Sequence, residues 1–212
     1  KMKILMPLNL SLNYSFSRHW FLKIGFEYSS GRAFTAQQYT VDWDGKEETY
    51  DYDYSYRLSS LMPFIGIESR FSAFGIYAGV GYNITDFSFT QVLKYKEEGD
   101  ALLEEGDFYD TGGRAVAAIL GGKYMLRIGS KAKLLLKMEY LYLKIDSFSG
   151  DKTNSSGTTS GTIYTYEQNP YNMGWLPYWD LYAAEPVKMG FRNIKRLGLD
   201  LSCARFLIGF SF

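Results

Sequence analysis

The sequence ends with Arg205-Phe206-Leu207-Ile208-Gly209-Phe210-Ser211-Phe212. Bulky apolar side chains stand at every second position of this stretch, and the residues between them at 209 and 211 are small. A period of two places the apolar side chains on one face of a β-strand, and a terminal aromatic residue is typical of the last strand of an outer-membrane barrel. The stretch therefore predicts an antiparallel transmembrane β-barrel in the outer membrane of a diderm bacterium.

The composition agrees with a chain that crosses a membrane by strands. No run approaches the about 20 consecutive apolar residues that a membrane helix needs. The 212 residues include 19 Tyr, 15 Phe and 4 Trp, an excess that aromatic girdles at the two membrane interfaces explain. Lys plus Arg and Asp plus Glu number 23 each, which argues against a nucleic-acid partner. We expect one all-β domain over residues 1–212, surrounded by outer-membrane lipid and lipopolysaccharide.

Alternating polarity predicts seven long strands, each with an apolar face toward lipid and a polar face toward the lumen. They span residues 6–16, 20–29, 50–67, 74–84, 116–126, 134–142 and 190–212. The apolar positions change phase near Ser59, which we interpret as a β-bulge, and again near Cys203. Long loops are expected at 31–49, 94–113 and 149–187, and short turns at 17–19, 69–72 and 128–132.

The lengths of these connections give an orientation, because outer-membrane barrels keep periplasmic turns short and extracellular loops long. With the C-terminal aromatic residue at the periplasmic end, the last strand runs inward, and so does the first. Closed bacterial barrels have an even number of strands, so we expect one or three further strands before Lys1, in an eight-stranded or ten-stranded barrel. A strand over 190–212 would reach roughly 70 Å against a lipid band of about 25 Å, so the barrel should project beyond the membrane.

Several short segments share a pattern with one known family. They are Gly25-Phe26-Glu27-Tyr28, Phe34-Thr35-Ala36, Met62-Pro63-Phe64-Ile65-Gly66-Ile67 and Phe108-Tyr109-Asp110-Thr111-Gly112. These segments resemble the omptins, which are ten-stranded, vase-shaped outer-membrane endopeptidases. In this register the chain covers the last seven omptin strands.

The resemblance implies a water-activating site made of an Asp pair and a His-Asp pair at the barrel mouth. The omptin segment Asp-Glu-His-Tyr-Asp matches residues 106–110 here, with Phe108 at the His position and Gly106 at an Asp position. A phenyl ring cannot accept a proton, and general-base catalysis contributes about 10²- to 10⁴-fold. The single histidine, His19, falls in a predicted periplasmic turn. We therefore expect the protease chemistry to be lost or altered.

Two Asp-x-Asp segments are candidates for the catalytic Asp pair. In the omptin register that pair lies before Lys1, whereas an alternative register places it at Asp42 and Asp44, which flank a tryptophan. A second segment has Asp51 and Asp53. Two close carboxylates can hold a water between them, but the same pattern is common in solvated hairpins. We take Asp42 and Asp44 as the candidate catalytic residues.

The predicted extracellular loops are acidic and aromatic, whereas the periplasmic turns carry Arg and Lys. The candidate binding residues are Glu104, Asp107, Asp110, Trp175, Tyr178 and Trp179. An acidic rim attracts basic peptides or divalent cations, and the aromatic side chains form either a contact surface for carbohydrate or protein, host surface proteins included, or a lid. A solvated surface explains the charges as well. The segment at 151–154 is too loose for a calcium loop, so we expect neither a bound metal nor a cofactor.

Opposite charges are also predicted along the lumen. The pairs are Lys23 with Glu27, Lys137 with Glu139, and Asp200 with Arg205. Such pairs favour a structural polar core over an open pore. Three functions follow: a surface barrel that binds peptides or host components, an active endopeptidase that cleaves near basic residues, and a small transport or structural barrel.

Overall fold

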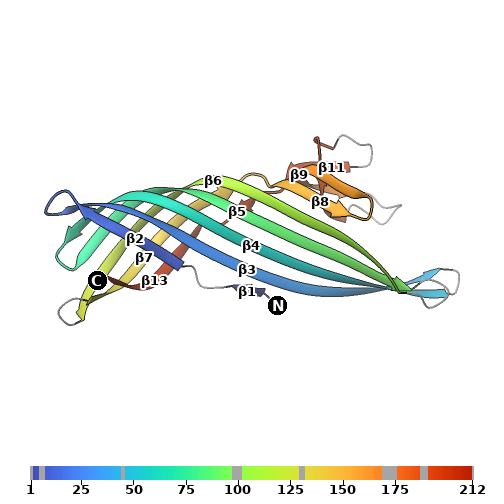
Figure 1. Ribbon diagram of the computed structural model, residues 1–212, viewed down its shortest axis with the longest axis horizontal. Coiled ribbons are helices and arrows are strands. Elements are labelled where there is room, and N and C mark those ends of the chain that lie inside the picture. Colours follow the sequence, from blue (N-terminus) through green and yellow to red (C-terminus); the bar gives the residue numbers. More distant parts are fainter. Residues whose placement is uncertain are drawn as a thin grey trace.

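The computed structural model describes residues 2–4, 8–43, 46–96, 102–128, 132–168, 176–186 and 191–211. These residues form strands, turns and bends, and the strands belong to one strongly curved sheet (Figure 1). Every strand pair is antiparallel. In the described part of the chain, no helix is long and apolar enough to cross a membrane. The predicted all-β antiparallel fold is confirmed.

Seven strands follow one another around the curved sheet, which is not closed into a barrel. In spatial order they are β2 (Leu8–Ser15), β3 (Trp20–Trp43), β4 (Lys46–Phe71), β5 (Phe74–Lys96), β6 (Leu102–Ile128), β7 (Ala132–Ile145) and β13 (Cys203–Ser211). Among the described strands, β2 pairs with β3 alone and β13 with β7 alone. Both outer strands therefore have one edge that no described strand covers.

Shorter strands extend this sheet at one end. They are β1 (Met2–Ile4), β8 (Ser149–Asn154), β9 (Gly157–Gln168), β10 (Leu176–Tyr182), β11 (Phe191–Arg196) and β12 (Leu199–Asp200). β8 continues the pairing along β6 where β7 ends, and β9 joins β8 to both β10 and β11. We call this end the upper half, and the end with the turns at 16–19 and 72–73 the lower half.

The predicted loops at 31–49 and 94–113 are wrong. β3 and β4 stay paired from Trp20 with Ser69 up to Trp43 with Lys46, and β5 and β6 stay paired up to Lys96 with Leu102. The predicted loop at 149–187 likewise contains β8, β9 and β10. Backbone pairing continues there although no outward apolar face marks the strands in the sequence.

The predicted β-bulge near Ser59 is also wrong, because β4 keeps one register with β3 along its whole length. What changes is the environment of the two faces. In the lower half, Leu61, Ile65 and Ile67 are exposed, whereas in the upper half the opposite face turns Tyr54 and Tyr56 toward the interior. The apolar residues change phase because the apolar side of the strand changes from outside to inside.

The predicted strand over 190–212 is divided into three. β11 pairs with β9, whereas β12 and β13 pair with β7. A turn separates β12 from β13, in which the Ser202 backbone N–H donates to Asp200 Oδ1 at 2.9 Å. The phase change near Cys203 thus marks a real break between strands.

The outer surface of the lower half is a band of exposed apolar side chains, which we call the apolar belt. It includes Leu10, Leu12, Tyr14, Ile24, Phe26, Tyr28, Ile65, Ile67, Ile76, Val80, Tyr82, Val116, Leu120, Tyr124, Met138, Tyr140, Tyr142, Phe206, Ile208 and Phe210. All seven long strands contribute to it. Above the belt the outward positions are mostly polar, such as Asp51, Asp53, Arg57 and Asp110.

Candidate functional site

The interior of the lower half contains charged side chains among buried apolar ones such as Phe64 and Leu135. Arg205 of β13 forms ion pairs with Glu27 of β3 and with Glu139 of β7, and all three side chains are at most 11% exposed. Asn9 Nδ2 donates to Glu27 Oε2 at 3.1 Å, and the Tyr77 hydroxyl donates to Glu139. Because Arg205 contacts β3 and β7 together, the inward faces of the two ends of the sheet meet here.

A second charged group lies nearer the lower turns. Lys123 Nζ is 2.6 Å from Oε1 of Glu68, which is fully buried and also pairs with Arg70. The ammonium of Lys23 lies 4.2 Å from the centre of the Tyr77 ring, close enough for a cation–π contact. The lower interior therefore holds buried carboxylates that are each paired with Arg or Lys, and a lysine that rests against an aromatic ring. We call both groups together the charged core.

The charged core uses other partners than the sequence suggested. Glu27 and Glu139 share Arg205, where the sequence suggested Lys23 and Lys137. Asp200 is exposed and interacts with Ser202, where the sequence suggested Arg205. The hydrogen bonds from Ser202 lower the pKa of the Asp200 carboxyl. Arg205 is 178 residues from Glu27 and 66 from Glu139, so spacing in the sequence cannot select these partners.

Gly121 on β6 leaves the space in which the Tyr77 side chain reaches Glu139. A Cβ at this position would lie 2.7 Å from Tyr77 Cζ and 2.8 Å from Glu139 Cβ. The next residue on the strand, Gly122, would place its Cβ no closer than 3.6 Å to any neighbour. The two adjacent glycines therefore offer a matched pair of substitutions.

Gly121→Ala should lower the free energy of unfolding by about 1–3 kcal/mol, because the added methyl group displaces the Tyr77 ring from Glu139. Gly122→Ala should change it much less. Urea unfolding of both variants in lipid vesicles measures the difference. Equal effects at the two positions would mean that the close approach at Gly121 has no energetic importance.

The interior of the upper half holds an aromatic cluster. The Phe89 ring lies 4.4 Å from the Trp179 ring and 4.7 Å from the Tyr56 ring, centre to centre. Tyr109 packs against Trp179 at 5.1 Å. Trp179 belongs to β10, so β10 packs its side chains onto the concave face of β5 and β6. The predicted rim residue Trp179 thus lies partly buried inside.

A polar group borders the aromatic cluster. Tyr109 Oη donates to Asp180 Oδ1 at 2.9 Å, and Lys152 Nζ lies 3.1 Å from the same oxygen. Lys152 Nζ is also 3.3 Å from Asp107 Oδ2. The other carboxylate oxygen of Asp107, Oδ1, accepts a hydrogen bond from Asn154 Nδ2 at 3.2 Å. Burial and the neighbouring Asp180 raise the pKa of the Tyr109 hydroxyl. The sequence pointed to Asp107 but missed Lys152 and Asp180, since only the β6–β8–β9–β10 pairing brings them together.

The remaining candidate residues do not converge in the described structure. Phe108 and Asp110 are exposed on the outer face of β6, opposite to the side that carries Tyr109. The backbones of Asp42, Glu104 and Tyr178 lie in β3, β6 and β10, but their side chains are outside the described residues, as are Asp44 and Trp175. His19 lies in the lower turn, where its Nδ1 is 3.2 Å from the carbonyl oxygen of Arg70.

Comparisons with protein-family models, with curated proteins and with solved structures find no match for this chain. The omptin resemblance therefore depends on the short sequence segments alone. Within the described part of the chain, no three His, Cys, Asp or Glu side chains converge in a way that could hold a metal ion.

Proposed function

We propose that this protein spans the outer membrane of a diderm bacterium as part of a closed β-barrel. The observation that carries the proposal is the apolar belt, which continues across all seven long strands and is followed above by mostly polar outward positions. On β5 it runs from Phe74 to Ile84. This length agrees with the about 9–11 residues of a tilted membrane-spanning strand. Outer-membrane lipid and lipopolysaccharide then contact the belt, and the upper half projects outside.

The charged core supports an anchoring role rather than transport. Arg205, Glu27 and Glu139 connect strands from both ends of the sheet across the interior, at the level of the belt. Small eight-stranded barrels are filled by side chains in this way, whereas wider barrels leave an aqueous channel. In this proposal the lower half fixes the protein in the membrane, and the upper half carries the activity.

We expect no steady ion conductance when the protein is inserted into a planar phospholipid bilayer in concentrated KCl. The paired charges of the core occupy the space that a channel would need. Insertion should be checked in parallel by protection of the belt from added protease. A stable open channel formed by the wild-type protein would favour the transport alternative.

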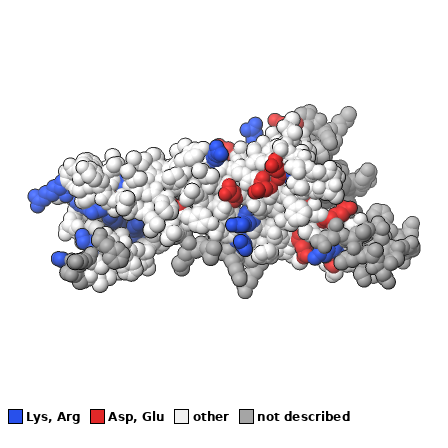
Figure 2. All heavy atoms as spheres, viewed as in Figure 1, with Lys and Arg blue, Asp and Glu red and all other residues white. Residues whose placement is uncertain are grey.

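The activity that the upper half supports best is the binding of basic peptides or basic surfaces of host proteins. The Asp and Glu side chains visible in Figure 2 lie over the upper half of this face, together with some Lys and Arg, whereas the charged side chains in view at the lower end are Lys and Arg. Asp110 and Asp151 occupy directly opposite positions on β6 and β8, and both are exposed. Two like charges on neighbouring strands create a local negative potential that a cationic ligand relieves.

Replacing Asp110 and Asp151 together by asparagine should weaken binding of a lysine-rich peptide by about three- to tenfold at low salt. The effect should shrink as salt is added, because exposed charges are screened. Binding can be measured by fluorescence anisotropy of the labelled peptide. Asp200→Asn, which removes an exposed carboxylate on β12, a strand that pairs with β7 instead, is the control. An unchanged affinity in the double variant would exclude this pair as the binding surface.

The proposal does not include proteolysis. Phe108 and Gly106 stand at the omptin His and Asp positions, so neither residue supplies an acid–base group, and the Phe108 side chain is on the outer face of β6. Inside the upper half, the corresponding level is occupied by Tyr109, Lys152 and Asp180, which are bonded to one another. This arrangement favours an omptin-like barrel that lacks the protease chemistry.

A further inference from the structure

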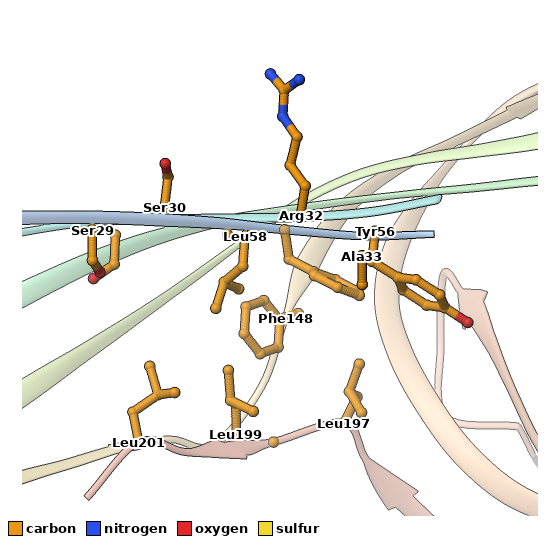
Figure 3. Close-up of a pocket in the computed structure, with 14 residues that line it drawn as sticks. Ser29, Ser30, Arg32, Ala33, Tyr56, Leu58, Phe148, Leu197, Leu199 and Leu201 are labelled. Atoms are coloured by element: carbon orange, nitrogen blue, oxygen red, sulfur yellow. The ribbon is translucent and has the colours of Figure 1, made fainter. Parts of the chain in front are cut away.

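An apolar cavity of about 430 Å³ lies on the concave side of the sheet (Figure 3). Small-molecule sites typically have volumes of about 300–1,000 Å³. Its walls come from β3, β4, β5, the residue before β8, and β12 with the residues on either side of it. The apolar side chains that line it are Tyr56, Leu58, Phe87, Phe148, Leu197, Leu199 and Leu201.

The lining offers almost nothing to a charged ligand. Arg32 is the one charged residue among those that line the cavity, and its side chain is exposed and points away from it (Figure 3). The hydroxyl of Ser60 accepts a hydrogen bond from Asn83 Nδ2 at 2.5 Å. A polar group inserted here would lose its bonds to water without replacement. The part of a ligand that enters the cavity must therefore be apolar.

The position of the cavity indicates where such a ligand comes from. Ser29 and Ala33 line it from β3, directly above Tyr28 at the upper margin of the apolar belt. Tyr28 faces outward and the cavity opens on the other face of the same strand, so in the proposed membrane orientation the cavity lies inside the barrel at the level of the outer leaflet. The hydrocarbon chains of that leaflet are the apolar groups nearest to it. Dry apolar cavities readily accept apolar guests of matching size.

We propose that this cavity binds a single alkyl chain of an amphiphile, with the polar head group remaining outside the cavity. The chain belongs either to a free fatty acid or to a membrane lipid, since both present the same hydrocarbon. This inference goes beyond the proposed surface binding, because it concerns the interior and does not involve the acidic residues.

The test is photocrosslinking of the wild-type protein in phospholipid vesicles. One probe is palmitic acid with a diazirine on its chain, and the other is a phosphatidylglycerol with the same modified chain. We expect crosslinks at inward-facing Leu58 and Leu199, removed by excess unmodified palmitate. Labelling by the fatty acid alone identifies a free acid as the ligand, and labelling by both probes identifies a lipid chain. Crosslinks confined to outward belt residues would overturn the proposal.

Ala33→Trp, which fills the cavity from β3, should reduce the crosslinks at Leu58 and Leu199 by about tenfold or more. Ala36→Trp, an exposed position on the same strand, should leave them unchanged. Belt crosslinks by the phospholipid probe report in each sample that the barrel is folded and inserted. If the Ala33→Trp variant loses the belt crosslinks as well, it has not folded, and Leu199→Trp is used instead to fill the cavity from the opposite wall. Persisting crosslinks at Leu58 in a folded, filled variant would contradict the proposal.

Discussion

Arg205→Met should lower the free energy of unfolding by about 3–5 kcal/mol, the largest loss that we expect from any single substitution in the charged core. Arg205 is the guanidinium that faces Glu27 and Glu139, and these side chains are only 9% and 2% exposed. Methionine fills a similar volume but leaves two buried carboxylates without their cation. The loss thus reflects unpaired charge rather than a cavity.

A combined variant separates these two causes. Arg205→Met with Glu27→Gln and Glu139→Gln should recover most of the lost stability, because no uncompensated charge remains. Arg192→Met is the control, since Arg192 pairs with Glu167 at the surface, where such pairs contribute about 0–1 kcal/mol. Urea unfolding in lipid vesicles gives all three values. A loss at Arg205 no larger than that at Arg192 would mean that the charged core does not hold the two ends of the sheet together.

The lower half could be predicted from the sequence because one physical rule governs it. The outward side chains there are apolar, so the period of two is visible from Ile24 to Tyr28 and again from Phe206 to Phe210. The inward positions include charged and small residues as well as buried apolar ones such as Phe64 and Leu135. The short turns between these strands follow from the same alternation.

The upper half could not be predicted in the same way, because the rule inverts without any break in the backbone. On β4, Asp51 and Asp53 face outward while Tyr54 and Tyr56 join the interior cluster. A strand with polar residues facing outward and aromatic residues facing inward lacks the outward apolar pattern of a lipid-facing strand. In the sequence, such a strand is therefore mistaken for an aromatic-rich loop. A search for both phases of the alternation would have extended β4 to its full length.

The interior contacts illustrate a second limit. The sequence identified Glu27, Glu139 and Arg205 as lumen charges, but their pairing depends on how the sheet curves. Likewise, Asp107 meets Lys152 and Asp180 because β8 pairs with β6 and β10 packs against the concave face, and no spacing in the sequence encodes this arrangement.

Leu120→Arg is expected to cost about 2–4 kcal/mol of folding stability in a lipid bilayer, because it places a charge near the middle of the hydrocarbon layer. Leu120 lies centrally in the belt on β6 and its side chain is 65% exposed. In water, a substitution at so exposed a position would usually change stability by less than about 0.5 kcal/mol. The size of the effect therefore reports directly on what surrounds the belt.

Phe108 provides the matched control on the same strand. It is also an outward apolar residue, 52% exposed, but it stands above the belt. The decisive measurement is urea unfolding in phospholipid vesicles, followed by tryptophan fluorescence, for Leu120→Arg and Phe108→Arg side by side. A membrane-spanning belt predicts a loss of about 2–4 kcal/mol for the first variant and less than about 0.5 kcal/mol for the second. Equal losses in the two variants would contradict the placement of the belt in the membrane.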